Sequence, residues 1–538
     1  MSATATSRAL LFCGQGSHKK GMAMDVIAKH GSSAARVFNT TSDTMMQSYH
    51  VHLGSLIKDA PVDMMIDKSA LSHVSVNRPF GLANTALTGE SSRDLVKVYD
   101  KQGLMNITAF AQAAMVSAQL ALLEDAREFK TLAMDNVRCV AGHSLGEFTA
   151  LSSLGVFPPD VLVDLVWRRG VFMQKAVDVY ASVSRRHEFL MYACNPKRAQ
   201  LDTLVSAEEQ GNNKSEAERI TAGDVFCVLV ELVAQALQTT TSFVELVNVN
   251  VEGEQYVVAG DAVALAALGK VLDPQFRANV PTNAAGGVSM QQVVRHAVEA
   301  VRVDQADGIT ERPNLPPPPD FVPSSGKRYG KPNIFKRVLS GIDDGKTPAL
   351  DRLTHLTLED DGRSGLKRKS WYIPLTVATP FHSSLLRRTV DDLYPLLLQA
   401  LPSDNVIEKV MNCSGALSGS GQDPRPSWVT NLTGTTFGTH APFREEAADY
   451  LSAMNVGEVA HNGKFSIPTS QPQMLEVLKS SQSPRELIAV VLAGQAAHPV
   501  QWVNSMETMF STVGVTAVTE IAPQPTLSEM VKRSGFLR

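Results

Sequence analysis

The sequence has few cysteines, no long apolar run and no marked excess of one charge. No apolar stretch of eighteen residues or more occurs in its 538 residues, which excludes a transmembrane helix, and 50 basic against 54 acidic residues argue against nucleic-acid binding through bulk charge. None of the cysteines has the C-x-x-C spacing of a zinc or redox site; they are Cys13, Cys139, Cys194, Cys227 and Cys413. We therefore expect no membrane partner, no nucleic-acid partner and no metal site. We also expect a reducing compartment, the cytoplasm in preference to the mitochondrion.

The residues that are present are typical of a large globular protein. A hydrophobic content of 44% with 19% charged residues is ordinary for a folded chain. Near the N-terminus, ALLFCGQGS predicts a buried strand that breaks at two glycines. Further along, ITAFAQAAMVSAQLALLEDA predicts a helix, VRCVAGHSLGEFTALSSLGVF a strand, a tight turn and a helix, and VLVDLVWRRGVFMQKAV another helix. This alternation indicates α/β units.

The pattern changes at about residue 187. Short strand candidates, FLMYACN, FVELVNVNVEG and QYVVAG, alternate with helices and indicate a smaller α+β lobe. From about 280 to 368 the sequence becomes irregular, with the run PPPP and the basic clusters GKRYGK and LKRK. We interpret this stretch as an insertion with one short helix, QQVVRHAVEAVR, and as a solvated excursion from the surface. After it, WYIPLTVATPFHS restores a strand pattern.

The segment from Gly142 to Gly146 fits G-x-S-x-G in the context that gives this motif its meaning. An apolar strand precedes it, and a helix-forming run starts at Glu147. Glycines permit the close turn that pushes the hydroxyl of Ser144 out of the sheet edge, and the helix N-terminus behind it offers N–H groups to an oxyanion. The segment predicts a nucleophile elbow, and the alternative is an ordinary glycine-flanked turn.

A serine nucleophile needs a base within hydrogen-bond reach, and thirteen histidines compete for that role. His143 is adjacent to Ser144, and neighbours on a tight turn point apart. His382 follows a strand and a proline, at a strand end where sites in α/β sheets tend to open. Spacing favours His382 only weakly, because a lone histidine is more often structural.

Seven segments, in a fixed order over residues 9 to 533, resemble the malonyl-CoA:acyl-carrier-protein transacylase family. They are LFCGQGSHKKGM, GHSLGE, WRRGVFMQ, LVNVNVEGEQYVVAG, PFHS, GQAAHPVQW and VTEIAPQPTLSEMVKR. The fourth, with a long segment before PFHS, is most similar to the malonyl/palmitoyl transferase domain of fungal-type fatty acid synthase β chains. Two places depart from the family pattern: His18 replaces the second glutamine of GQGSQ, and Ala522-Pro523-Gln524 replaces G-P-G.

The resemblance implies a two-lobed α/β fold. A large α/β-hydrolase-like lobe with a parallel sheet would comprise 1–186 and 375–538. A small ferredoxin-like lobe, 187–374, would be inserted into it and would carry the irregular stretch at 280–368. The segments 51–105 and 280–368 lie outside the seven motifs, and the resemblance assigns them no role.

The resemblance also implies roles for individual residues. Ser144 would be the nucleophile that becomes acylated, and His382 would be its base. The backbone carbonyl of Gln495 would orient the imidazole in place of a carboxylate. The backbone N–H groups of Gln15 and Leu145 would form the oxyanion hole.

Arg169 would hold the free carboxylate of the malonyl group, whereas we expect Arg168 to be a solvated helix charge. The implied activity is malonyl transfer from CoA to the phosphopantetheine thiol of an acyl carrier protein, in fatty acid or polyketide synthesis, with no bound cofactor. Three alternatives remain: a serine hydrolase or thioesterase on the same elbow, a transferase for longer acyl chains, and a docking module that keeps only the fold.

Overall fold

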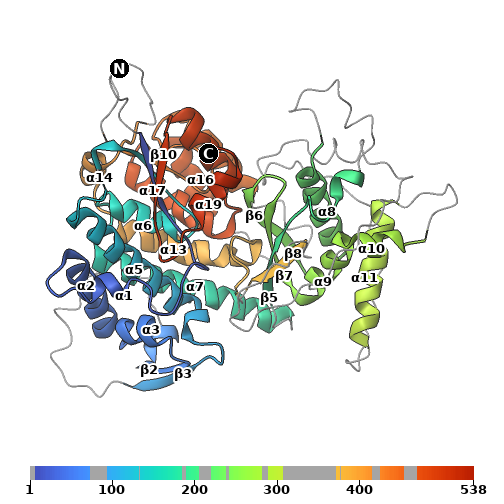
Figure 1. Ribbon diagram of the computed structural model, residues 1–538, viewed down its shortest axis with the longest axis horizontal. Helices are drawn as coiled ribbons and strands as arrows, with labels where there is room; N and C mark the ends of the chain where they lie inside the picture. Colours follow the sequence, from blue (N-terminus) through green and yellow to red (C-terminus); the bar gives the residue numbers. More distant parts are fainter. Residues whose placement is uncertain are drawn as a thin grey trace.

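Four parallel strands form the sheet of the larger lobe in the computed structural model (Figure 1). In spatial order they are β10 (Ala517–Ile521), β1 (Arg8–Phe12), β4 (Val137–Gly142) and β9 (Ser427–Val429). Phe12 pairs with Gly142 on one side and with Ile521 on the other. The carboxyl ends of β1 and β4 therefore lie side by side, which is where the predicted elbow begins.

The structure describes residues 7–72, 94–132, 134–184, 189–204, 220–237, 242–281, 289–306, 371–375, 377, 379–414, 425–453 and 469–537. Within these ranges the larger lobe contains the long helices α5 (Thr108–Glu128) and α7 (Pro159–Ser184), which pack against each other. Its other α-helices are α1 (Met24–Ile27), α2 (Ser33–Tyr49), α3 (Leu53–Asp59), α4 (Ser69–Ser72), α6 (Gly146–Ser153), α13 (Arg387–Ala400), α14 (Asp404–Val410), α15 (Ala441–Ser452), α16 (Gln471–Ser480), α17 (Pro484–Gly494), α18 (Trp502–Glu507) and α19 (Leu527–Arg533).

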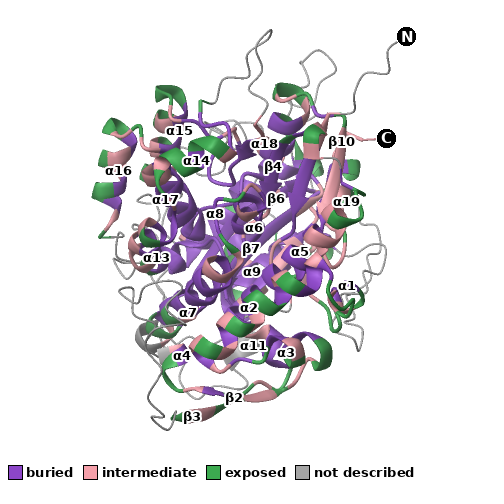
Figure 2. Cartoon of the chain, turned by 90° about the vertical axis from the view of Figure 1, so that its left-hand side faces the viewer, coloured by how far each residue is buried: buried purple, intermediate pink, exposed green. Residues whose placement is uncertain are grey.

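Buried residues concentrate on the inner strands, such as β1 and β4, and on the inner faces of the surrounding helices, whereas β10 is only partly buried (Figure 2). The run from Ala9 to Phe12 is fully buried, as expected of a parallel strand covered on both faces. Helix α5 is unusual because its first fourteen residues, from Thr108 to Ala121, are all buried. A helix with no solvated face lies in the interior of a protein, so the polar side chains of α5 must find their partners there.

The smaller lobe is the ferredoxin-like lobe that the resemblance implies. Its chain order is β-α-β-β-α-β and its sheet order is β6-β7-β5-β8, with every neighbouring pair antiparallel. The elements are β5 (Phe189–Cys194), α8 (Ala222–Ala236), β6 (Val244–Val251), β7 (Gln255–Asp261), α9 (Ala262–Leu272) and β8 (Tyr372–Leu375), with the short α10 (Pro274–Ala278) after α9. The predicted fold class, a parallel α/β lobe with an inserted smaller lobe, is confirmed.

Helix α11 (Met290–Ala306) shows that one part of the irregular stretch at 280–368 belongs to the core. Val294, Ala297, Val298 and Val301 are buried and pack with α8 and α9. The expectation of a solvated excursion is therefore wrong for this helix. Its apolar residues recur at spacings of three and four, which is the pattern of a helix packed on one face. Residues 282–288 and 307–368 of the stretch lie outside the described residues.

The strands of the two sheets locate the lobes along the chain. All strands of the parallel sheet lie within 1–186 and 375–538, and those of the small lobe run from β5 to β8, whose last residue is Leu375. The segment 51–105 contributes a separate antiparallel hairpin of β2 (Asp63–Asp67) and β3 (Leu95–Tyr99) to the larger lobe. Residues 73–93 between these strands lie outside the described part of the chain.

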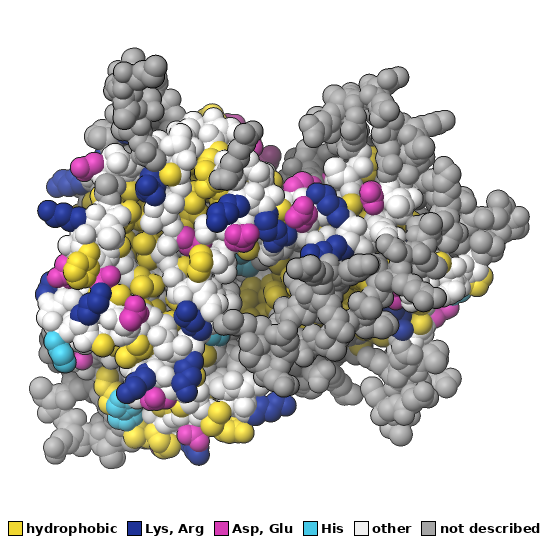
Figure 3. All heavy atoms as spheres, viewed as in Figure 1, with side chains coloured by type: hydrophobic (Ala, Val, Ile, Leu, Met, Phe, Trp, Pro, Cys, Tyr) yellow, Lys and Arg dark blue, Asp and Glu magenta, His cyan; other side chains and the backbone are white. Residues whose placement is uncertain are grey.

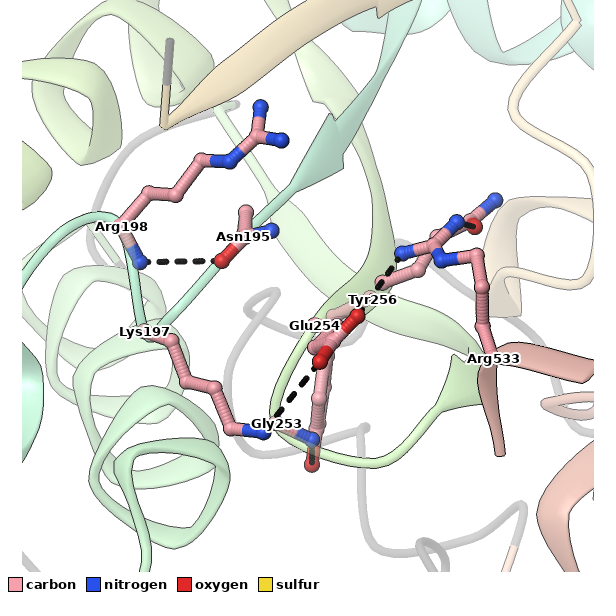
Figure 4. Close-up of polar contacts among 8 residues, drawn as sticks. Asn195, Lys197, Arg198, Gly253, Glu254, Tyr256 and Arg533 are labelled. Carbon is pink, nitrogen blue, oxygen red and sulfur yellow. Dashed lines mark hydrogen bonds and ion pairs between the residues drawn. The ribbon is translucent and has the colours of Figure 1, made fainter. Parts of the chain in front are cut away.

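Polar contacts hold the two lobes together. At the end of α19, Arg533 donates from Nη1 to Oε1 of Gln255 at 2.7 Å, and its Nη2 lies 3.3 Å from Oε2 of Glu254 in the turn between β6 and β7 (Figure 4). Deeper in the molecule, the buried carboxylate of Glu245 on β6 accepts hydrogen bonds from the backbone N–H, at 2.8 Å, and the hydroxyl of Ser384. The small lobe is thus anchored close to the segment that carries His382.

Candidate active site

The turn between β4 and α6 has the geometry of a nucleophile elbow. Ser144 adopts a left-handed conformation, with φ of 54°, which a non-glycine residue holds only where its surroundings impose it. A Cβ atom added to Gly146 would lie 1.9 Å from the carbonyl oxygen of Phe12, and one added to Gly142 would lie 1.9 Å from the carbonyl carbon of Gly146. Both glycines are therefore required by close backbone approach.

Three of the predicted site residues meet in one hydrogen-bonded chain. Nε2 of His382 lies 2.7 Å from Oγ of Ser144, and its Nδ1 lies 2.8 Å from the backbone oxygen of Gln495. A carbonyl oxygen can only accept, so Nδ1 carries the proton and the lone pair of Nε2 faces the serine hydroxyl. This is the tautomer that a general base requires.

The environment keeps the imidazole of His382 neutral. Burial is the main cause, and it lowers the pKa of His382 from 6.5 to about 3; the charge of Arg169 acts in the same direction, while the bond to the Gln495 carbonyl opposes it. A neutral imidazole is available to take a proton from Ser144 over the whole physiological pH range.

The two predicted oxyanion-hole segments lie against each other. Leu145 immediately precedes the first turn of α6, where backbone N–H groups have no partner within the helix. Gln15 belongs to the loop after β1, and this loop approaches the elbow so closely that a Cβ atom on Gly14 would lie 2.6 Å from the carbonyl oxygen of His143. The structure thus brings the segments of Gln15 and Leu145 together beside Ser144.

Asn431, in the turn after β9, forms hydrogen bonds with the backbone of the elbow, and no sequence pattern pointed to it. Its Oδ1 accepts the backbone N–H of Ser144 at 2.6 Å, its Nδ2 donates to the carbonyl of Gly142 at 2.5 Å, and its own N–H donates to Oε1 of Glu147 at 2.8 Å. The amide of the nucleophile is therefore engaged and does not add a third donor to the oxyanion hole. A bond across 287 residues of sequence leaves no local signal by which it could be predicted.

His143 points away from the nucleophile, as its position next to Ser144 suggested. Its Nε2 lies 3.0 Å from Oδ1 of Asn250 on β6, and its ring makes an edge contact with Trp502, with centroids 5.4 Å apart. Asn250 belongs to the segment LVNVNVEGEQYVVAG. This contact joins the elbow of the large lobe to the small lobe.

Arg169 on α7 is a buried cation without hydrogen bonds at two of its nitrogens. It is 1% exposed, and its Nε and Nη2 have no hydrogen-bond partner among the described residues. Its guanidinium carbon lies 5.2 Å from the ring centroid of Phe148. Burial lowers its pKa to about 9, and the carboxyl group of Glu147 acts in the opposite direction. Arg169 thus remains charged at neutral pH, and its charge lowers the pKa of His382.

Arg168 differs from the prediction of a solvated helix charge. Its side chain is fully buried, and it donates to Asp164 from Nε at 3.0 Å and from Nη2 at 2.6 Å. The hydroxyl of Tyr49 donates to the same carboxylate. The prediction is wrong because α7 is buried on several sides, and the acidic residue four positions earlier was the signal for a helical ion pair.

The molecular surface has a recess between the two lobes. In Figure 3 hydrophobic side chains are visible inside this recess, and side chains of both charges gather beside it.

Within the described ranges no group of three or more His, Cys, Asp or Glu residues is placed to hold a metal ion, and no helix is long and apolar enough to cross a membrane.

Comparison with known proteins identifies the family. The family model described as "Acyl transferase domain" matches residues 9–303. The fatty acid synthase subunit beta of Gibberella zeae is 28% identical over 388 residues, which are 69% of this chain and 17% of the relative. The corresponding subunit of Schizosaccharomyces pombe is 29% identical over 473 residues, which are 84% of this chain and 19% of the relative. The chain thus spans less than a fifth of either relative.

Solved structures with a similar backbone include the acyl-carrier-protein-S-malonyltransferase from Bartonella henselae. It is 16% identical, has a TM-score of 0.45, and the match covers 98% of this chain and 92% of that one. The family model, by contrast, covers more than half of the chain and includes the elbow and Arg169. The chain therefore belongs to the acyl transferase domain family.

Proposed function

We propose that this acyltransferase moves a malonyl group from CoA to the phosphopantetheine thiol of an acyl carrier protein, through an ester on Ser144. The observation that carries the proposal is the buried, charged guanidinium of Arg169, which acts electrostatically on His382 and has two nitrogens without partners among the described residues. An unpaired buried charge is costly, so such a group is retained where a ligand of opposite charge neutralises it. Malonyl carries that charge, and acetyl does not.

In the first half of the reaction, Oγ of Ser144 attacks the thioester carbonyl carbon while its proton passes to Nε2 of His382. The oxyanion is held by the amides of Gln15 and Leu145, and the carbonyl of Gln495 stabilises the imidazolium through Nδ1–H. The intermediate collapses by breaking the C–S bond. Nε2 of His382 returns the proton to the sulfur of the departing CoA.

In the second half, the phosphopantetheine thiol takes the place of CoA. Its ordinary pKa of about 8.5 leaves only a few per cent as thiolate at pH 7, so His382 accepts its proton as the sulfur attacks the ester carbonyl. The C–O bond to Ser144 breaks, and His382 returns the proton to Oγ. The same base and the same oxyanion hole therefore serve both halves.

Arg169 is the residue that would make the reaction selective. The planar guanidinium can form a bidentate pair with the free carboxylate of malonyl, which a lysine could not reproduce. Its free Nε and Nη2 are adjacent donors of the kind that such a pair uses. We further propose a cytoplasmic location, which agrees with five free, buried cysteines, and acyl carrier protein as the acyl acceptor.

Mass spectrometry of the intact protein after incubation with malonyl-, acetyl- and palmitoyl-CoA tests the proposal. We expect the malonyl adduct to accumulate fastest, on the peptide that contains Ser144, and to be absent from Ser144→Ala. Transfer to holo carrier protein should exceed release of free malonate. An adduct on a cysteine, or rapid hydrolysis without transfer, would overturn the proposal in favour of a hydrolase, and preferential palmitoyl labelling would assign a longer acyl chain.

A further inference from the structure

Gln119, in the middle of α5, connects the two segments that carry the oxyanion-hole amides. It is fully buried, its Nε2 donates to the backbone oxygen of Cys13 at 2.8 Å, and its Oε1 accepts the hydroxyl of Thr149 at 2.8 Å. Cys13 begins the loop that contains Gln15, and Thr149 lies on α6, directly after the elbow. One buried side chain thus contacts both segments that carry the proposed oxyanion-hole amides.

The direction of these bonds is determined by chemistry. The Cys13 carbonyl can only accept, so the amide nitrogen of Gln119 must face the loop and its oxygen must face Thr149. Nε2 also lies 3.2 Å from Sγ of Cys13. The rotamer of Gln119 is therefore fixed at both ends of its amide.

A second buried group holds the same loop. Oγ of Ser17 lies 2.7 Å from Sγ of Cys13 and 3.2 Å from the carbonyl oxygen of Gly14. In a trans peptide the carbonyl and the N–H of the next residue point in opposite directions. With the Gly14 carbonyl turned toward Ser17, the N–H of Gln15 points away from these interior partners.

We propose that Gln119 is a positioning residue of the oxyanion hole, which fixes the loop of Gln15 relative to the first turn of α6. The inference rests on the proposed acyl-transfer function and deepens it. Donors in an oxyanion hole act only when they are preorganised around the developing charge, and small displacements of such groups cost large factors in rate. Substrate binding does not depend on this geometry to the same extent.

Gln119→Met should therefore lower kcat by about 10- to 100-fold while KM changes by less than about threefold. Both half-reactions should slow to a similar degree, because both form an oxyanion. Gln471→Met is the matched control. Gln471 is also buried, and its Nε2 donates to a backbone carbonyl, that of Leu451, at 2.8 Å, in a part of the large lobe that carries none of the proposed site residues.

The experiment compares the two variants in melting temperature, in the burst of CoA release from malonyl-CoA, and in the rate of labelling by a fluorophosphonate. The phosphonate reacts with Ser144 by losing fluoride, and its P=O oxygen needs the same hole. We expect similar losses of melting temperature, with slow bursts and slow labelling only for Gln119→Met. Equal kinetics in the two variants, or a rise in KM alone, would overturn the inference.

Thr149 provides a second pair of variants that keeps the inference testable if Gln119→Met does not fold. Thr149→Val removes the hydroxyl that donates a hydrogen bond to Gln119, and it should slow labelling by about three- to tenfold. Thr149→Ser keeps a hydroxyl at this position and should be labelled at about the wild-type rate. Equal rates in Val and Ser variants would contradict the inference. The phosphonate also separates the two proposals: a wild-type protein that reacts with it and with no acyl-CoA would refute the proposed function alone.

Discussion

Arg168 and Arg169 are neighbours on one helix, and both are buried, yet they have opposite surroundings. Arg168 forms a bidentate pair with Asp164 that Tyr49 completes, whereas Nε and Nη2 of Arg169 have no hydrogen-bond partner among the described residues. Consecutive helical residues point about 100° apart, so Arg168 faces a structural network, whereas Arg169 lies over the ring of Phe148 and its charge acts on His382. The difference separates a cation that is paired within the fold from one that we propose binds the substrate carboxylate.

The largest effect is expected from a substitution of Arg168, the arginine that is paired with a carboxylate. Arg168→Met should lower the free energy of unfolding by about 3–5 kcal/mol, because Asp164 is left buried without its counter-ion. Urea unfolding measures this loss. The ratio of kcat/KM for malonyl-CoA to that for acetyl-CoA should remain unchanged in the protein that is still folded. A variant as stable as the wild type would show that the pair contributes nothing.

The same substitution at Arg169 should change substrate selectivity and leave stability unchanged. Arg169→Met leaves the malonyl carboxylate buried without a partner and should reduce kcat/KM for malonyl-CoA by about two to three decades. Acetyl transfer should hold or rise, since acetyl brings no charge. The unfolding free energy should not fall, because the substitution removes an unpaired buried cation. A parallel decline of both substrates would make Arg169 structural, like Arg168.

The pH dependence gives a third, smaller test. Since burial lowers the pKa of His382 to about 3, the acid limb of kcat/KM should lie below pH 5, whereas a histidine of pKa 6.5 would lose about 30-fold by pH 5. The folded pKa lies below the unfolded one, so the neutral form stabilises the protein above about pH 6.5, and this contribution is lost as the pH falls toward 3.

The arginine comparison sharpens that test. Arg169→Met should move the acid limb upward, because the charge of Arg169 is one of the causes that lower the pKa of His382. Arg168→Met should leave it in place, because Arg168 is not among those causes. A limb near pH 6.5 in the wild type would contradict a buried, neutral base.

The smallest effect is expected at Glu147, the acid that faces Arg169. Burial raises the pKa of Glu147 well above the ordinary range. Its Oε1 accepts a hydrogen bond from the N–H of Asn431, and the amide oxygen of a glutamine at this position can accept the same bond. Glu147→Gln should therefore change kcat/KM at pH 7 by less than about threefold. The raised pKa of Glu147 stabilises the folded protein at low pH, and this contribution is lost as the pH rises above about 4.5. At alkaline pH the free energy of unfolding of Glu147→Gln should therefore equal or exceed that of the wild type. A loss of several-fold in activity would show that Arg169 needs a charged partner.

Local sequence patterns predicted many elements of this structure, because strands, turns and helices leave their signals in residues that are close together in the sequence. Alternation and glycine breaks located β1, β4 and the strands of the small lobe, and G-x-S-x-G located the elbow at Ser144. The place of His382 after a strand and a proline favoured it weakly, and the family resemblance strengthened that choice and supplied Gln495. Arg168 was misjudged because a charged residue on a helix is usually solvated, and only the packing of α7 reveals its burial.

Asn431 and Gln119 could not be found in this way. Each is an ordinary polar residue whose partners lie far away in sequence, and buried polar groups are explained by contacts that only the fold creates. The same holds for Asn250, which contacts the elbow from the small lobe. Ser144, His382 and the orienting carbonyl of Gln495 could be proposed from sequence motifs, whereas the side chains of Asn431, Gln119 and Asn250 could not.

The wide spacing of Ser144, His382 and Gln495 along the chain has a consequence for synthesis. Translation delivers the serine first, the histidine 238 residues later and the carbonyl of Gln495 113 residues after that. Because domains fold as units while the chain emerges, a nascent chain that exposes the elbow has neither a base nor the group that orients it. Under the proposed function, we therefore expect Ser144 to stay unacylated in a nascent chain until Gln495 has been made.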